Sequence, residues 1–166
     1  MMMKFKKMII RIIRTVCCIG VLFWATFQFA LIVSKNKDRT VQKFKTYYLM
    51  MISWMNILEN ERSIGGYLKT KGYQKVAVYG VSSAGYHLLK QLKGTEVNVE
   101  YLIDRTVFSN ELNFLPIYRP DDSLPETDAI IVTPIWDYQN IKAKLSGKIN
   151  CPILSLSEVI EGVQNV

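Results

Sequence analysis

KVAVYGVSSAG, residues Lys75 to Gly85, is the stretch that decides the fold. Residues 76–79 are apolar, mostly β-prone and without polar alternation, which predicts a strand buried on both faces of a parallel sheet. Gly80 predicts a tight turn after that strand. From Ser83 onward, apolar residues recur at three- and four-residue spacing, which indicates a helix. A strand, a glycine turn and a helix in this order open a βαβ unit, so we expect an α/β fold.

The glycines follow the order of the dinucleotide fingerprint G-x-G-x-x-G, in which an acidic residue comes about 20 positions later. Gly80 and Gly85 take the first and third glycine places, whereas Ser82 takes the second. Asp104 takes the acidic place, where it would contact a ribose. The predicted phosphate-binding residues at the helix N-terminus are Gly80, Ser82, Ser83, Ala84 and Gly85. The alternative is that both glycines serve packing only and that Asp104 is a solvated loop residue.

Further candidate binding residues follow the ends of two more predicted strands. These strands cover residues 97–103 and 129–133, and ligands of open α/β sheets bind beyond the carboxyl ends of the strands. The residues presented there are Arg105, Thr133, Pro134 and Trp136. Thr133 can hydrogen-bond a ligand, and Trp136 can stack on a base or a sugar ring. Trp136 can equally cover the sheet edge or contact a partner.

The positive charge of the chain is confined to its N-terminal end. The formal net charge is +7, and residues 1–45 hold ten of the 21 Lys and Arg residues but one of the 14 acidic residues. The remainder is therefore slightly acidic, and no basic stripe with interleaved aromatic residues crosses it. This distribution argues against nucleic-acid binding.

An uncharged run inside the basic end predicts a membrane anchor. Residues 15–33, TVCCIGVLFWATFQFALIV, contain no charged residue over 19 positions, which is long enough to cross a bilayer core of about 30 Å. Both flanks are basic, so the positive-inside rule gives no orientation. Two alternatives are a signal peptide, although no clean cleavage site follows, and a buried or partner-binding helix. We expect a single-pass membrane protein.

Cysteine and histidine usage excludes two classes of site. The three cysteines, Cys17, Cys18 and Cys151, form no disulfide framework, which fits a reducing compartment and a domain on the cytoplasmic side. His87 is the sole histidine and has no second His or Cys nearby in sequence, so no metal site is predicted. We expect His87 to have a structural role on the helix after Gly80.

A second helix, which is amphipathic, is predicted between the anchor and the α/β domain, over residues 41–58. Its apolar residues at three- and four-residue spacing form the heptad seam of a short coiled coil: Val41, Phe44, Tyr48, Met51, Met55 and Leu58. Tyr47, Trp54 and Ile57 broaden this stripe. We expect the stripe to pack back onto the α/β domain of its own chain. The alternatives are a homodimer, or binding of another protein through the same helix.

The sequence predicts three parts: residues 1–36 with the transmembrane helix, a helical connector at 37–72, and the α/β domain at 73–166. The domain is expected to hold a parallel sheet of four strands plus a short one. No nucleophile elbow, P-loop or well-placed Tyr-x-x-x-Lys pair is visible, so catalytic residues are unknown. General acid–base work would fall to Asp104, Asp137 or Tyr138, and nothing in the sequence selects among them.

Four segments carry a family resemblance: SIGGYLKTKGYQKVAVYGVSSAG, VEYLIDR, DAIIVTPIWDYQNIKAKL and CPILSLSEVI. They resemble a family of small Rossmann-like domains of bacterial capsule and surface-polysaccharide biosynthesis. These domains are similar to the nucleotide-sugar-binding N-terminal domains of sugar acetyltransferases and to the C-terminal domain of sugar C-methyltransferases. The resemblance implies a three-layer Rossmann-like fold and a nucleotide-sugar site at Gly80, Gly85 and Asp104. It implies no acetyltransferase activity, because the left-handed β-helix of those enzymes is absent.

These observations lead to one expected function and two alternatives. The expected function is that of a membrane-anchored, non-catalytic module that binds a nucleotide, a dinucleotide such as NAD(P), or a nucleotide sugar in surface-polysaccharide biosynthesis. One alternative is an NAD(P)-dependent oxidoreductase or epimerase-like enzyme that needs a partner for its missing half. The other is a scaffold without a ligand, which recruits partners through the connector helix.

Overall fold

The computed structural model describes residues 2–106 and 115–165. The chain forms two compact units, residues 1–45 and residues 46–166. We call the second unit the α/β domain. One helix, α1 (Met2–Glu59), begins in the first unit and ends in the second.

The first unit consists of the N-terminal part of α1, which contains the apolar run and its basic flanks. Within Cys17–Glu59, the most apolar window of 18 residues has a mean hydropathy of 2.0 and no buried residue. By length and composition this segment can cross a membrane, and an N-terminal signal sequence has the same character. The two helices predicted at 15–33 and 41–58 are parts of one helix. The residues between them, 34–40, include no glycine or proline, and the Thr40 hydroxyl bonds back to the Asn36 carbonyl at 3.0 Å.

The α/β domain is built on a five-stranded parallel sheet in the order β3-β2-β1-β4-β5. The strands are β1 (Lys75–Tyr79), β2 (Asn98–Ile103), β3 (Ile117–Tyr118), β4 (Ala129–Val132) and β5 (Ile153–Ser155). This confirms the predicted parallel α/β, Rossmann-like fold. The strand order reverses between β1 and β4, which creates a switch point where the ends of these two strands diverge toward opposite layers.

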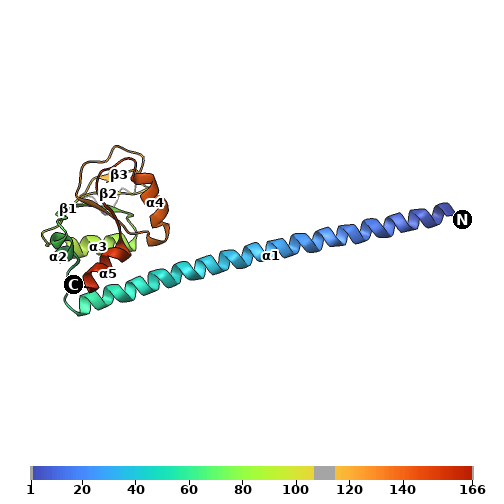
Figure 1. The fold of residues 1–166 in the computed structure, drawn as a ribbon, viewed down its shortest axis with the longest axis horizontal. Helices are drawn as coiled ribbons and strands as arrows, with labels where there is room; N and C mark the ends of the chain where they lie inside the picture. The colour runs from blue at the N-terminus through green and yellow to red at the C-terminus, as the bar shows by residue number, and fades with distance from the viewer. Residues whose placement is uncertain (1, 107–114, 166) are drawn as a thin grey trace. The chain divides into compact units, whose positions relative to one another are not determined.

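Helices cover both faces of the sheet (Figure 1). They are α2 (Ile64–Thr70), α3 (Ser83–Leu92), α4 (Tyr138–Leu145) and α5 (Leu156–Gln164), with a short 3-10 turn η1 (Ile135–Asp137) before α4. The last turns of α1 together with α2, α3 and α5 pack on one face, and α4 packs on the other. The final helix begins with a capping box, in which the Ser155 N–H donates to Glu158 Oε2 at 2.9 Å.

The central strand serves two cores. Val76 and Val78 face the layer that contains α3, whereas Ala77 and Tyr79 face the layer that contains α4. All four are buried, as the lack of polar alternation predicted. The sequence therefore specifies a strand that is covered on both faces.

The C-terminal part of α1 belongs to the α/β domain. Met50, Trp54 and Ile57 are at most 5% exposed, and Trp54 Nε1 donates to Gln91 Oε1 of α3 at 2.9 Å. The helix ends in a Schellman-type turn, in which Arg62 N bonds to the Ile57 carbonyl and Glu61 has a positive φ of 56°.

The expected packing of the heptad stripe onto the domain is confirmed for Tyr47, Trp54 and Ile57, which broaden the stripe, and is wrong for the heptad positions themselves. The stripe residues of the domain unit, Tyr48, Met51, Met55 and Leu58, are 40–65% exposed. The buried residues are instead members of the neighbouring row, because Trp54 and Ile57 lie one position before Met55 and Leu58. His87, expected to have a structural role on helix α3, is exposed.

A bulge in β2 changes the side-chain alternation. Val76 of β1 pairs with Val99, but the next residue, Ala77, pairs with Tyr101, so Glu100 is an extra residue. Val97 and Val99 consequently face the α3 layer, whereas Tyr101 and Ile103 face the α4 layer. The bulge thus moves Tyr101 and Ile103 to the α4 core and turns Leu102 to the α3 core.

Replacement of Trp54 tests whether the end of α1 is an integral part of the domain. We expect Trp54→Ala to lower the free energy of unfolding by about 3–5 kcal/mol, because a large buried side chain is lost. Asn56→Ala, two positions away on an exposed side, should change it by less than about 0.5 kcal/mol. The measurement is denaturant unfolding of the detergent-solubilised chain, followed by near-UV circular dichroism. Equal effects of the two substitutions would contradict this assignment.

Candidate functional site

The turn between β1 and α3 is shaped by two glycines. Gly80 has a φ of +97°, and a Cβ at Gly80 would lie 2.7 Å from the Thr133 hydroxyl oxygen. A Cβ at Gly85 would lie 2.1 Å from the Gly80 carbonyl oxygen, which is impossibly close. Both glycines are therefore required by packing: the first allows the turn, and the second lets α3 approach the strand end.

Asp104 lies at the carboxyl end of β2 and holds this turn in place. Its Oδ2 accepts a hydrogen bond from the Val81 N–H at 2.8 Å, and its Oδ1 accepts one from the Thr106 N–H at 2.9 Å. The carboxylate predicted to contact a ribose is thus engaged by backbone amides on both oxygens. A carboxylate oxygen can accept a second bond, so a ligand hydroxyl would have to share these atoms.

Thr133 is a structural residue of the same turn. Its side chain is 1% exposed, and its hydroxyl lies 3.0 Å from the Gly80 carbonyl oxygen and 3.2 Å from that of Tyr79. Pro134 follows and packs beside Gly80, since its Cδ would lie 2.8 Å from a Cβ there. The predicted hydrogen-bonding group of Thr133 therefore points into the protein.

The first turn of α3 faces solvent beside these packed residues. Ser82 and Ser83 are exposed, and Ala84 is half-buried. Ser82 is the N-cap residue, and its side chain makes no capping hydrogen bond within the described part of the chain. The first backbone N–H groups of a helix have no intrahelical acceptor and carry a partial positive charge. This end of α3 combines those groups with two exposed hydroxyls.

Arg105 adds a fixed positive charge on the α4 side of the edge. Its Nη2 lies 2.9 Å from Asp137 Oδ2, and hydrogen bonds to Tyr79 and Asp137 raise the pKa of its guanidinium. The pKa of Asp137 is lowered, first by a hydrogen bond from Asn140 and then by Arg105, against burial. The Arg105 side chain remains 58% exposed, so the ion pair leaves it accessible to an anion.

Trp136 and Tyr47 border the loop after β4. Trp136 is 42% exposed and stands between Ile135 and Asp137 in η1. Burial raises the pKa of the Tyr47 hydroxyl, whereas hydrogen bonding to the backbone of Trp136 and Ile135 lowers it. The end of α1 therefore touches this loop. Sequence reasoning missed this role of Tyr47, although the residue was noted at the border of the heptad stripe.

The structure brings the predicted site residues together at one edge of the sheet but divides their roles. Gly80, Gly85, Thr133 and Pro134 pack against one another, and Asp104 braces the turn. Ser82, Ser83, Arg105 and Trp136 are exposed. Tyr138, considered for acid–base work, is buried and donates to the Ile153 carbonyl at 2.8 Å. No group of three metal-binding side chains occurs among the described residues.

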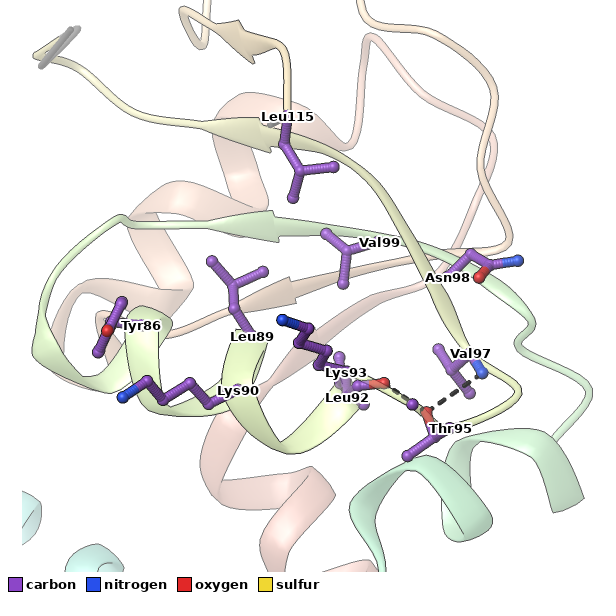
Figure 2. A pocket seen from close by; sticks show the side chains of 11 residues that line it. Tyr86, Leu89, Lys90, Leu92, Lys93, Thr95, Val97, Asn98, Val99 and Leu115 are labelled. Atoms are coloured by element: carbon purple, nitrogen blue, oxygen red, sulfur yellow. Dashed lines mark hydrogen bonds between the residues drawn. The ribbon is translucent and has the colours of Figure 1, made fainter. Parts of the chain in front are cut away.

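A separate hollow of about 560 Å³ lies between α3 and β2. Figure 2 shows Leu89 of α3, Val99 of β2 and Leu115 directed toward it. The Thr95 hydroxyl at its end is already bonded to the Leu92 carbonyl at 2.8 Å and to the Val97 N–H at 3.3 Å. The hollow contains none of the predicted site residues and offers chiefly apolar contact.

Substitution of Asp104 tests its role as a brace. Asp104→Asn leaves one acceptor oxygen, so an NH₂ group must face either the Val81 or the Thr106 N–H. We expect unfolding to become easier by about 1–3 kcal/mol, with faster hydrogen exchange at the Val81 amide. Asp121→Asn is the control, because Asp121 is exposed and bridges Lys148 at 3.1 Å on the surface. If Asp104→Asn changes neither the free energy of unfolding nor the hydrogen exchange at the Val81 amide, Asp104 does not stabilise the turn.

The close approach at Gly85 can be tested by adding a single methyl group at this position. Gly85→Ala places a methyl group against the Gly80 carbonyl, and we expect a loss of stability of at least about 1–3 kcal/mol from overpacking. Gly147→Ala is the matched control, since a Cβ there meets nothing within 4 Å. Thermal midpoints of the two variants in the same detergent provide the comparison. A midpoint for Gly85→Ala equal to that of Gly147→Ala would contradict the close approach.

No family model, no curated protein and no solved structure matches this chain.

Proposed function

We propose that the α/β domain binds a ligand with a nucleotide or diphosphate group at the carboxyl edge of its sheet and is attached to a membrane by α1. The observation that carries this proposal is the β1–α3 turn. It lies at the switch point of a parallel sheet, and the packing of Gly80 and Gly85 brings an exposed helix N-terminus there. Open α/β sheets bind their ligands at such points.

The phosphate would lie against the first turn of α3. The unpaired N–H groups and the positive end of the helix dipole favour an anion. The hydroxyls of Ser82 and Ser83 can donate additional hydrogen bonds. Ser82 replaces the glycine that would allow the closest approach, so its hydroxyl would take the place of a direct contact to the backbone. Arg105, paired with Asp137 but 58% exposed, supplies a guanidinium group on the other side of the edge.

The rest of the ligand would extend toward the loop after β4. Trp136 presents an exposed aromatic ring on which a base or a sugar can stack. Asp104 would meet a ribose hydroxyl only by accepting a second bond on an oxygen that a backbone amide already uses. This engagement favours a ligand whose binding depends on its phosphates and its ring more than on the ribose.

The family resemblance supports a nucleotide sugar as the ligand and surface-polysaccharide biosynthesis as the process. NAD(P) is the other ligand class that the glycine pattern suggests. We place the domain on the cytoplasmic side, which agrees with three cysteines that form no disulfide framework. In this proposal α1 crosses the membrane once through residues 15–33, and the domain is a binding module without its own catalytic group.

A second candidate is a scaffold that binds no small molecule. The observations that favour it are the engaged Asp104 carboxylate and the buried Thr133 hydroxyl, since both predicted ligand contacts serve the turn itself. An oxidoreductase or epimerase-like enzyme is the third candidate. It would need a proton-transfer group from elsewhere, because the Tyr138 hydroxyl is engaged inside the domain.

A thermal-shift experiment on the full chain in detergent separates these candidates. We would test NAD, NADP, UDP-sugars and nucleoside diphosphates, because a ligand at about 100 times its Kd stabilises the folded state by about 2.7 kcal/mol. A shift with UDP-sugars, nucleoside diphosphates, NAD or NADP supports the proposed module and gives its ligand class, whereas turnover of the bound compound would favour the enzyme. No shift with any compound, from a folded protein, favours the scaffold.

Two variants show whether a shift arises at the proposed site. Ser82→Asp keeps a good N-cap residue, so the fold should be retained, but its charge repels a phosphate and should abolish the shift. Asn150→Asp adds the same charge in the loop before β5, at the amino edge of the sheet, and should preserve the shift. A shift that survives Ser82→Asp would place the ligand elsewhere.

A further inference from the structure

An apolar stripe on α1 is left uncovered by the domain to which the helix is attached. Its members in the domain unit are Tyr48 (65% exposed), Met51 (40%), Met55 (51%) and Leu58 (52%). We call these four residues the seam. In the sequence the same spacing continues backward to Phe44 and Val41, which are 70% and 54% exposed. Such large apolar surface in a regular row marks an interaction site.

The domain of the same chain cannot cover the seam, because it is bound to a different row of the helix. Met50, Trp54 and Ile57 carry that contact, and Gln164 Nε2 bonds to the Ser53 carbonyl at 3.1 Å on the same side. Successive residues of a helix are about 100° apart, so Tyr48 and Met55 stand well away from this row. The helix thus has two apolar rows with two separate tasks.

The geometry points to a second copy of this chain as the partner of the seam. We propose that two α1 helices pack in parallel along residues 41–58 as a short coiled coil. The three–four spacing places Val41, Tyr48 and Met55 at the a positions of successive heptads. Phe44, Met51 and Leu58 take the d positions. A row at this spacing is complementary to itself in a parallel pair, since each residue inserts between residues of the same row on the other helix.

The charges that flank the seam permit this pairing. In a parallel coiled coil, each g residue meets the e residue five positions later on the other helix. The facing g and e positions are Thr40 with Lys45 and Tyr47 with Ile52. Trp54, the last g residue, is buried against its own domain and takes no part in the pairing. Neither pair opposes like charges, and no a or d position from 41 to 58 holds a charged residue.

The membrane segment compensates for the short length of the seam. Two and a half heptads alone form too little contact for a stable soluble dimer. Two chains anchored in one bilayer, however, present their helices in the same direction, and confinement raises their effective concentration. The same constraint favours the parallel arrangement over the antiparallel one. This inference rests on the proposed membrane span of α1 but not on what the carboxyl edge of the sheet binds.

Disulfide scanning in liposomes tests the interface without disturbing the fold. Cys17, Cys18 and Cys151 are first replaced by Ala, and single cysteines are then placed at each seam position in the full chain. Leu49→Cys and Asn56→Cys are matched controls, because both positions are exposed on another side of the same helix turns. We expect mild oxidation to crosslink the four seam variants strongly and the two controls weakly. Equal crosslinking at all six positions, or stronger crosslinking at the controls, overturns the proposal.

A charge substitution provides an independent measurement. Met51→Asp combined with Met55→Asp should reduce the dimer fraction at least about tenfold, because two charges would be buried in each helix. Asn56→Asp should leave the fraction unchanged. The fraction is counted from photobleaching steps of labelled chains at low density in liposomes, and near-UV circular dichroism confirms the fold. A wild-type chain that is monomeric there, or a dimer that persists in the double variant, overturns the proposal.

Discussion

The contact between Gly85 and the Gly80 carbonyl is the constraint on which the rest of the domain depends. It brings the start of α3 against the end of β1 more closely than any side chain would allow. Thr133 then bonds across to the Gly80 carbonyl from β4, and Asp104 reaches the Val81 amide from β2. Three neighbouring strands are therefore joined at their carboxyl ends around one turn. The exposed residues of the edge, Ser82, Ser83 and Arg105, are held in position by this packed turn.

The sequence predicted the main layers well, because each depends on a local pattern. The unalternated run at 76–79 specified a strand covered on both faces, and the glycine turn specified the following helix. The end of α1 at Glu59 lies one residue from the predicted end at 58, although the left-handed residue after it is Glu61 and not a glycine. The single long helix was missed. An apolar run at 15–33 and an amphipathic pattern at 41–58 suggested two helices, but no glycine or proline between them breaks the backbone.

Side-chain roles at the site were less predictable than the site's location. Spacing placed Asp104 and Thr133 at the correct edge, but it did not show that backbone amides and carbonyls would engage them. Such bonds join residues more than 20 positions apart and become visible only once the strands are in register. The spacing of the heptad row likewise did not show which row of the helix the domain would cover. Its spacing was correct, but the domain packs on the adjacent row, a difference of one position that burial alone reveals.

The bulge at Glu100 makes β2 unusually sensitive to its own length. The residues after it face the opposite layers from those that an unbroken strand would give them. This phase sends Asp104 to the α3 side, where the Val81 amide lies, and Arg105 to the α4 side, where Asp137 lies. A one-residue deletion in β2 would exchange these two side chains between the layers. Insertions and deletions in β2 should therefore be poorly tolerated, even at the exposed residue Glu100.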